Sequence, residues 1–274
     1  MARTTKKRQQ QLKHDKFRDT TMHAIDRLAH RYEGRGRTIL YALAAVAAAV
    51  VLLLAFNWWR GSKASEAQLA LGKAIEIHGA QVTTTPQPGA PGPVFPSERE
   101  RAQKAVEEFR RVQQTYGSPY SDIARYFAAV NLVTVEREKG IAELEELTRS
   151  GEAEVAARSR FALAQAREGE GKLDAAAALY QELLKDGNKY VTENTLKLRL
   201  ATVYEKQGKR DEAVNLLFPM VEAARKAKTK DGKPQPESQL VRAAADKLQE
   251  LSPERYAQLP PDETAGGNSL SARP

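Results

Sequence analysis

Cysteine is absent from the 274 residues, and histidine is scarce. The lack of cysteine excludes disulfide bonds, thiol nucleophiles, thiolate metal sites and a lipid anchor attached through a cysteine. Three histidines precede the one long hydrophobic run and one follows it, so they are not expected to share a site. No close carboxylate pair completes a zinc ligand set, and only the last histidine could assist a serine nucleophile beyond the run. The sequence therefore predicts no metal, no cofactor and no enzymatic activity. The four histidines are His14, His23, His30 and His78.

A phosphate-binding loop is also not supported. The tetrapeptide GEGK at 169–172 lacks the G-x-x-x-x-G-K-[ST] spacing and a preceding strand, and it aligns with a turn of an internal repeat. Strand-like alternation is nearly absent beyond residue 60. The composition there is rich in Ala, Leu, Glu, Lys, Arg and Gln, which are good helix formers. We expect an all-α protein.

The long hydrophobic run is Thr38 to Trp59, which contains twenty-two residues and no formal charge. As a helix it covers about 33 Å, enough for the hydrocarbon core of a bilayer. Its ten Leu, Ile, Val and Phe residues contribute roughly −3 to −6 kcal/mol to insertion. The two tryptophans at its end are typical of a membrane interface. The run predicts one N-terminal transmembrane helix.

Two other interpretations of this run are a cleavable signal peptide and a buried core helix. A signal peptide needs a short basic start and a small-residue cleavage site. Here the preceding arm has thirty-seven residues, and the run ends in FNWWRG without an A-x-A pattern. The transmembrane anchor is therefore the favoured interpretation.

The excess positive charge lies before the run. Residues 1–37 hold eleven Lys/Arg and four Asp/Glu, whereas residues 60–274 hold thirty-two and thirty-one. Because positive flanks stay cytoplasmic, we expect a cytoplasmic arm and a C-terminal part outside the cytoplasmic (inner) membrane, in the periplasm or its equivalent. The bias is smaller near the run, with four Lys/Arg in 20–37 and three in 60–79.

The basic arm itself allows several roles. Its apolar residues fall near one face of a short helix, a pattern that suits binding at a membrane surface. A disordered arm and a cytoplasmic partner remain as alternatives. Nucleic-acid binding is less favoured than a role in setting topology. The apolar residues are Phe17, Ile25, Leu28 and Tyr32.

Composition divides the chain into six segments. Prolines at 86, 88, 91, 93 and 96 block helix and ladder formation, so this stretch is expected to be an extended loop. The last residues, rich in Pro, Gly, Asn and Ser, are expected to be disordered. The predicted segments are a cytoplasmic arm (1–37), a transmembrane helix (38–59), a juxtamembrane helix with the Pro-rich loop (60–97), helical repeats (98–228), a linker with a capping helix (229–256) and a disordered tail (257–274).

An internal repeat is visible at an offset of thirty-seven residues, between the segments that begin at Phe161 and Leu198. A fixed period in the thirties is the signature of a helical solenoid. The repeated glycine can end a helix with a positive φ, the repeated aspartate can cap the next helix, and the alanines allow close packing. The matched pairs are Leu163 with Leu200, Ala164 with Ala201, Gly171 with Gly208, Asp174 with Asp211, Ala176 with Ala213 and Leu179 with Leu216.

These residues resemble the tetratricopeptide repeat (TPR) family over about residues 98–228. In the unit around Gly171, Arg167 stands where the pattern has an aromatic residue, and the unit from Ser121 to Leu147 is degenerate. The resemblance implies an α-solenoid of antiparallel helix pairs that binds other proteins. The unit around Gly208 carries the pattern through Leu200, Ala201, Tyr204, Gly208, Ala213 and Leu217.

The order of arm, anchor and repeats is similar to that of bacterial single-pass periplasmic TPR proteins associated with the Sec translocon. The run YGSPYSDIARYFAA adds to this likeness. It implies an ancillary, chaperone-like subunit whose partners are translocon components, secretory clients or envelope complexes. A structural scaffold for envelope assembly or cell division is the alternative.

In the TPR family the first helix of each pair lines the binding groove. Transferred to this sequence, the pattern gives four residues in each of two repeats. They lack the Lys/Asn clamp that holds terminal carboxylates, so a broader and weaker protein-binding surface is expected. The implied groove residues are Arg158, Phe161, Gln165, Glu168, Thr195, Leu198, Thr202 and Glu205.

Overall fold

The structure is a computed structural model that describes residues 36–85 and 92–263, apart from the side chains of residues 36–40 and 56–62. The chain divides into two compact units, Met1–Ser65 and Glu66–Pro274. Nearly all of the predicted basic arm, and the roles expected for it, lie outside the described residues.

The first unit is described only by the early part of helix α2 (Gly36–His78). The side chains of residues 41–55 are all exposed. Within the part of the chain that the structure describes, no helix combines the length and apolarity needed to cross a bilayer. The predicted span, Thr38 to Trp59, extends at both ends into residues whose side chains lie outside the description.

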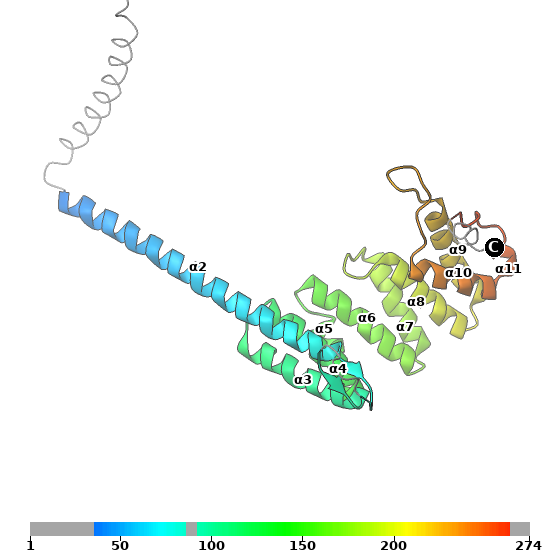
Figure 1. The fold of residues 1–274 in the computed structure, drawn as a ribbon, viewed down its shortest axis with the longest axis horizontal. Helices are drawn as coiled ribbons and strands as arrows, with labels where there is room; N and C mark the ends of the chain where they lie inside the picture. The colour runs from blue at the N-terminus through cyan, green and yellow to red at the C-terminus, as the bar shows by residue number, and fades with distance from the viewer. Residues whose placement is uncertain (1–35, 86–91, 264–274) are drawn as a thin grey trace, which may run out of the picture. The chain divides into compact units, whose positions relative to one another are not determined.

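The second unit is a mainly helical solenoid in which consecutive helices pack side by side (Figure 1). It begins with the last part of α2. A two-residue strand pair, β1 (Gln81–Val82) and β2 (Val94–Phe95), separates α2 from the next helix. The remaining helices are α3 (Glu98–Thr115), α4 (Tyr120–Val135), α5 (Arg137–Leu147), α6 (Ala153–Gly169), α7 (Leu173–Lys185), α8 (Glu193–Lys206), α9 (Arg210–Lys226), α10 (Gln239–Leu251) and α11 (Pro253–Tyr256).

The two aligned turns have the same backbone geometry. Gly171 has φ 73° and Gly208 has φ 75°, in the left-handed region that glycine occupies without strain. The next N–H reaches back over the turn: Lys172 donates to the Arg167 carbonyl at 2.9 Å, and Lys209 donates to the Tyr204 carbonyl at 2.8 Å. These bonds satisfy the last carbonyls of α6 and α8. The role expected for the repeated glycine is confirmed.

The expected helix caps differ from the structure. Lys172 and Lys209 are the N-cap residues of α7 and α9, and neither helix has a side-chain cap. The repeated aspartates lie inside the first turn, where a carboxylate still meets the positive end of the helix dipole. Helix α4 begins after Pro119 and also has no side-chain cap.

Four apolar clusters run along the second unit, and each joins neighbouring helices. The first contains residues of α2, α3 and α4, and the last contains residues of α8, α9 and α10. Alanines sit at the closest crossings because a methyl group lets helices approach. Since each cluster involves only adjacent helices, stability should be a sum of nearest-neighbour terms. The alanines with no exposed surface include Ala105, Ala128, Ala164, Ala201 and Ala213.

The unit from Ser121 to Leu147, which the sequence describes as degenerate, has an unusually short connection. A single residue, Glu136, separates α4 from α5. Gly140 then lies directly against α4: an added Cβ would sit 2.4 Å from the backbone nitrogen of Val133. The departure from the repeat pattern therefore reflects tighter packing of this helix pair.

Arg167, which replaces the aromatic residue of the other repeat, links two helix pairs. It forms ion pairs with Glu145 of α5 and, at 2.9 Å, with Glu170 at the end of α6. Ion pairs thus take the place of the aromatic contact in this repeat.

The segments on either side of the Pro-rich loop pair with each other. Strands β1 and β2 pair in parallel, and the Thr83 N–H donates to the Phe95 carbonyl at 2.9 Å. The loop between them is closed at its base, although residues 86–91 lie outside the description.

The predicted disordered tail begins too early. Leu259 is buried in the last apolar cluster, and the Arg225 guanidinium donates to the Pro260 carbonyl at 2.9 Å. Packing therefore continues to at least Pro260, because these residues cover the end of α9. Residues 264–274 lie outside the description.

Candidate protein-binding face

The first helices of the pairs form a layer of their own, which we call the inner helices: α4, α6, α8 and α10. Helix α4 contacts α6 as well as α5, and α10 contacts α8 as well as α9. Helices α6 and α8 are joined by the ion pair of Glu168 with Lys206, so successive members of this layer are linked to one another. The predicted groove residues all belong to this layer.

Glu168 is not a free groove carboxylate. Its side chain is 9% exposed and accepts a hydrogen bond from Lys206 Nζ at 2.6 Å, so it ties α6 to α8. The Tyr180 hydroxyl also donates to it at 3.5 Å. Burial, and secondarily the Glu168 charge, raise the pKa of Tyr180. This carboxylate is therefore part of the link between two repeats.

Glu205 repeats this arrangement one repeat later. It pairs with Lys247 of α10, and both side chains are about three-quarters buried. Together the two pairs form a ladder of Glu–Lys contacts along the inner helices. We call this the inner ladder. It links α6 to α8 and α8 to α10.

The other six predicted residues are half-buried and lie on α6 and α8. Three of them use their polar atoms locally. Arg158 Nε donates to Glu154 Oε1 at 2.8 Å, Thr202 Oγ1 donates to the Leu198 carbonyl at 2.9 Å, and the Thr195 and Thr192 hydroxyls are hydrogen-bonded at 2.7 Å. Their remaining surface is open to a partner. The six are Arg158, Phe161, Gln165, Thr195, Leu198 and Thr202.

Sequence reasoning missed the contribution of α4. Tyr126 is half-buried there and lies within electrostatic reach of Arg158. Burial raises the pKa of the Tyr126 phenol, and the nearby guanidinium opposes this in part. With Phe161 and Leu198, it provides partly buried apolar side chains on three successive inner helices. No signal pointed to Tyr126, because the unit that contains it does not align with the others.

The partners of the inner ladder were also missed. Glu205 is the repeat equivalent of Glu168, and Lys206 is the residue after it. The period of thirty-seven therefore places Lys206 one residue past the position that matches Glu168. Lys247 has no such signal, since the capping helix does not align.

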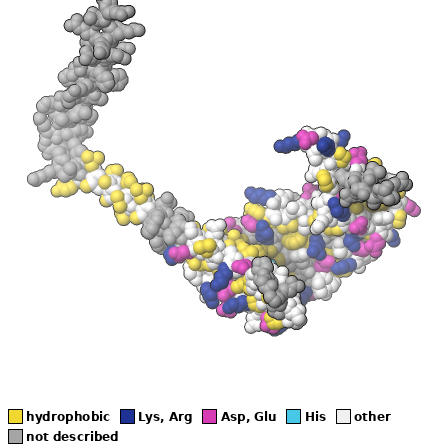
Figure 2. Space-filling view, viewed as in Figure 1, with side chains coloured by type: hydrophobic (Ala, Val, Ile, Leu, Met, Phe, Trp, Pro, Cys, Tyr) yellow, Lys and Arg dark blue, Asp and Glu magenta, His cyan; other side chains and the backbone are white. Residues whose placement is uncertain are grey.

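Charge over the second unit is mixed rather than segregated. Figure 2 shows basic and acidic side chains interspersed over its visible face. Many are paired within or between helices, as in Lys104 with Glu107 at 2.8 Å and Arg125 with Glu146 at 2.6 Å. Such a surface does not favour nucleic acid over protein partners.

His78, the one histidine that the structure describes, is a packing residue. Its Nδ1–H donates to Asn131 Oδ1 at 3.0 Å, and the Asn131 amide in turn donates to the Phe127 carbonyl at 2.7 Å. The ring contacts Phe109 and Phe127. Among the described residues, no group of three or more His, Cys, Asp or Glu could hold a metal ion.

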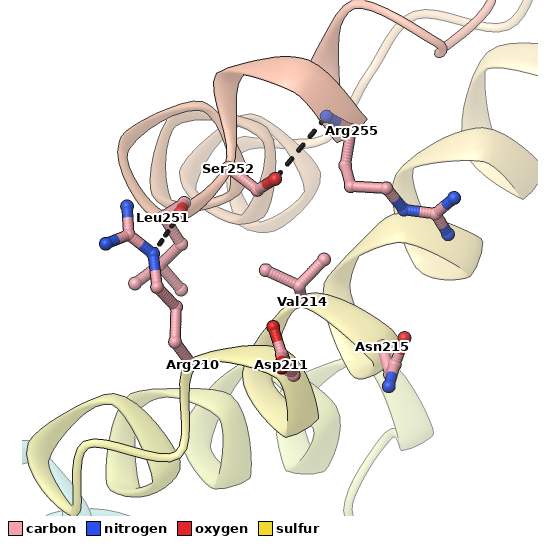
Figure 3. A pocket seen from close by; sticks show the side chains of 7 residues that line it. All are labelled: Arg210, Asp211, Val214, Asn215, Leu251, Ser252 and Arg255. Carbon is pink, nitrogen blue, oxygen red and sulfur yellow. Dashed lines mark hydrogen bonds between the residues drawn. The ribbon is translucent and has the colours of Figure 1, made fainter.

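A surface pocket of about 540 Å³ lies at the end of the solenoid, between the start of α9 and the α10–α11 junction (Figure 3). Arg210 donates to the Leu251 carbonyl and, at 3.2 Å, to the Glu250 carbonyl, so it caps α10. The Arg255 guanidinium lies 4.2 Å from the centre of the Phe218 ring. Both arginines thus make structural contacts, and none of the predicted groove residues lines the pocket.

No protein-family model matches the chain, and no curated protein matches it. Solved structures of TPR-like repeats from a Podosopora anserina kinesin light chain, and of a variant of that protein, are similar to it. Both are 19% identical to this chain, with a TM-score of 0.44 over 56% of its length. The match covers 78% of the first solved chain and 77% of the variant. This similarity does not establish family membership.

Proposed function

We propose that the chain is a non-enzymatic, membrane-tethered repeat protein that binds other proteins through its inner helices, outside the cytoplasmic membrane. The observation that carries this proposal is that Tyr126, Phe161 and Leu198, on successive inner helices, are only partly buried. A continuous face on a stacked array is the surface that repeat proteins present to partners. The more specific role is that of an ancillary, chaperone-like subunit of the Sec translocon.

The tether rests on the apolar run. Among the side chains that the structure describes, eight of the eleven exposed large hydrophobic ones lie between Tyr41 and Leu54. They gather on the described part of the first unit (Figure 2). Burial of such surface is favourable by roughly 25 cal/mol per Å², and a bilayer offers that burial. The charge of the arm favours an orientation with residues 1–37 in the cytoplasm.

The orientation is tested by adding protease to intact spheroplasts. We expect digestion of the repeats and protection of the arm. Protection of the repeats, together with cleavage of the arm by the added protease, would show the opposite orientation.

The inner face is tested by crosslinking in the native membrane, followed by mass spectrometry of the captured proteins. Gln165→Arg with Thr202→Arg places two new charges on the face without breaking an ion pair of the inner ladder. The matched control is Ala178→Arg with Asn215→Arg, which adds the same charge at exposed positions of the outer helices α7 and α9. We expect capture to fall for the inner variant alone.

Equal helicity of both variants is checked first by circular dichroism. If the control variant loses capture and the inner variant keeps it, the partner binds the outer side and the proposed face is wrong.

A scaffold for envelope assembly or cell division is the second candidate. It is favoured by the inner ladder, which holds neighbouring repeats in a fixed relation, as a rigid platform requires. The same crosslinking separates the two roles. Enrichment of unfolded secretory clients supports a chaperone-like subunit, and stable stoichiometric partners support a scaffold.

A further inference from the structure

The connection between α9 and α10 is an ordered hairpin rather than an open linker. Lys228 and Pro234 form an antiparallel bridge, and the Thr229 N–H donates to the Lys233 carbonyl at 2.8 Å. Gly232, with φ 74°, closes the turn by donating its N–H to the Thr229 carbonyl at 2.9 Å. We call residues 228–234 the basic hairpin. Figure 1 shows it projecting beyond the two helices that it joins.

A buried ion pair fixes the base of the hairpin. Arg225 Nε donates to Glu237 Oε1 at 2.9 Å, and their side chains are 8% and 5% exposed. The same guanidinium donates to the Tyr256 hydroxyl at 3.2 Å and to the Pro260 carbonyl at 2.9 Å. The two ends of the hairpin are thus held against α11 and the residues that follow it. These contacts therefore hold the hairpin in its projecting position.

The hairpin carries unpaired positive charge. Lys228, Lys230 and Lys233 are exposed, and no acidic side chain of the described residues lies within ion-pairing distance of them. Lys226, just before the hairpin, is already paired with Glu222 at 2.7 Å. This contrasts with the balanced, largely paired charge of the repeats. None of the hairpin's hydrogen bonds uses a lysine side chain.

We infer that the basic hairpin binds the phosphate groups of an anionic phospholipid surface. The exposed residues at its tip are Thr, Lys, Asp and Gly, without an aromatic or aliphatic side chain. Protein interfaces are anchored by aromatic residues and arginine and are depleted in lysine. Clustered lysines without apolar anchors instead suit attraction to a charged surface. The inference rests on the proposed tether, which keeps the chain at a membrane.

The expected effect is large enough to measure. The three lysines and Asp231 leave the hairpin with a net charge of +2. Each net positive charge close to an anionic bilayer favours the bound state about fivefold, so the hairpin favours it about 30-fold. The attraction should weaken strongly at about 1 M salt, where the Debye length falls to about 3 Å.

The test uses the full chain reconstituted in vesicles. Because the sequence has no cysteine, Gln235→Cys gives a single labelling position beside the hairpin without changing its charge. Energy transfer from this label to a headgroup-labelled lipid reports proximity to the surface. Vesicles of phosphatidylcholine alone are compared with vesicles that contain phosphatidylglycerol. A second label at Gly151→Cys, in the open turn before α6, is the reference position.

The charge variant is Lys228→Gln, Lys230→Gln and Lys233→Gln. The matched control is Lys185→Gln, Lys189→Gln and Lys209→Gln, which removes the same charge from exposed positions on the repeats. We expect transfer at position 235 to rise with phosphatidylglycerol, to fall back in the hairpin variant and in high salt, and to persist in the control. Excess inorganic phosphate, a free source of the same chemistry, should not compete.

Transfer that is independent of phosphatidylglycerol, or equal loss in both variants, would overturn the inference; an acidic protein surface would then be the partner to seek. Failure of the tether is read separately, as failure of the chain to float with phosphatidylcholine vesicles. In that case the label at position 235 reports whether the untethered chain binds added anionic vesicles, and this result tests the hairpin independently of the tether.

Discussion

Gly140 offers the sharpest test of the packing described above. Replacing it with alanine places a Cβ 2.4 Å from the backbone nitrogen of Val133 and 2.7 Å from the carbonyl carbon of Leu132. Ordinary carbon contacts begin at about 3.5 Å, so α5 must move away from α4 by about 1 Å. Both obstacles are backbone atoms of a helix and cannot rotate aside.

Two opposing terms set the size of the effect. Alanine is favoured over glycine inside a helix by about 1 kcal/mol. Overpacking costs about 1–3 kcal/mol, and contact with backbone on the facing helix places this case at the upper end. We therefore expect Gly140→Ala to destabilise the α4–α5 pair by about 2 kcal/mol.

The assay is hydrogen exchange of the full chain followed by mass spectrometry, because the nearest-neighbour clusters allow local opening. A loss of about 2 kcal/mol should speed exchange in α4 and α5 about 30-fold. The matched control is Gly72→Ala in α2, where nothing lies within 4 Å of the added Cβ. This change should slow exchange nearby. If Gly140→Ala also slows or does not alter exchange, α5 does not lie against α4 as described.

Three further changes probe other parts of the fold. Ala213→Leu should lower the urea midpoint followed by circular dichroism, at a cost of about 1–3 kcal/mol, since Ala213 has no exposed surface; an unchanged midpoint would contradict its place at a packed crossing. Glu237→Gln should cost about 3–5 kcal/mol by leaving the buried Arg225 charge unpaired, and Arg225→Met with Glu237→Met should recover most of this loss. Burial raises the pKa of Tyr180 above the usual 10.0, so the unfolded chain ionises first and stability should fall as the pH rises above that value. Tyr180→Phe should remove that part of the alkaline loss, as measured by the urea midpoint across the pH series.

The repeat architecture could be derived from local signals. The period of thirty-seven and the glycines at 171 and 208 predict helix pairs and their turns, because a positive φ and helical periodicity depend on residues near in sequence. The resemblance to the TPR family, which these repeats carry, implied a binding face on the segments that form α6 and α8. Periodicity indicates which way a side chain points, and this holds whatever the helix packs against.

Partners distant in sequence were decided only by the tertiary structure. Glu168 and Glu205 looked like groove carboxylates, but Lys206 and Lys247 neutralise them from the next inner helix. Whether a charge is free or paired depends on which atoms come near it, and helix spacing carries no such information.

The sequence by itself determined the helical composition, the repeat, the apolar run and the positive arm, since each is a property of neighbouring residues. Tertiary structure alone decided that Gly140 is a contact point, that the linker after α9 is a hairpin with unpaired lysines, and that packing extends past Tyr256. Each of these depends on the position of backbone or side-chain atoms far along the chain, and those positions are set by the stacking of the whole solenoid.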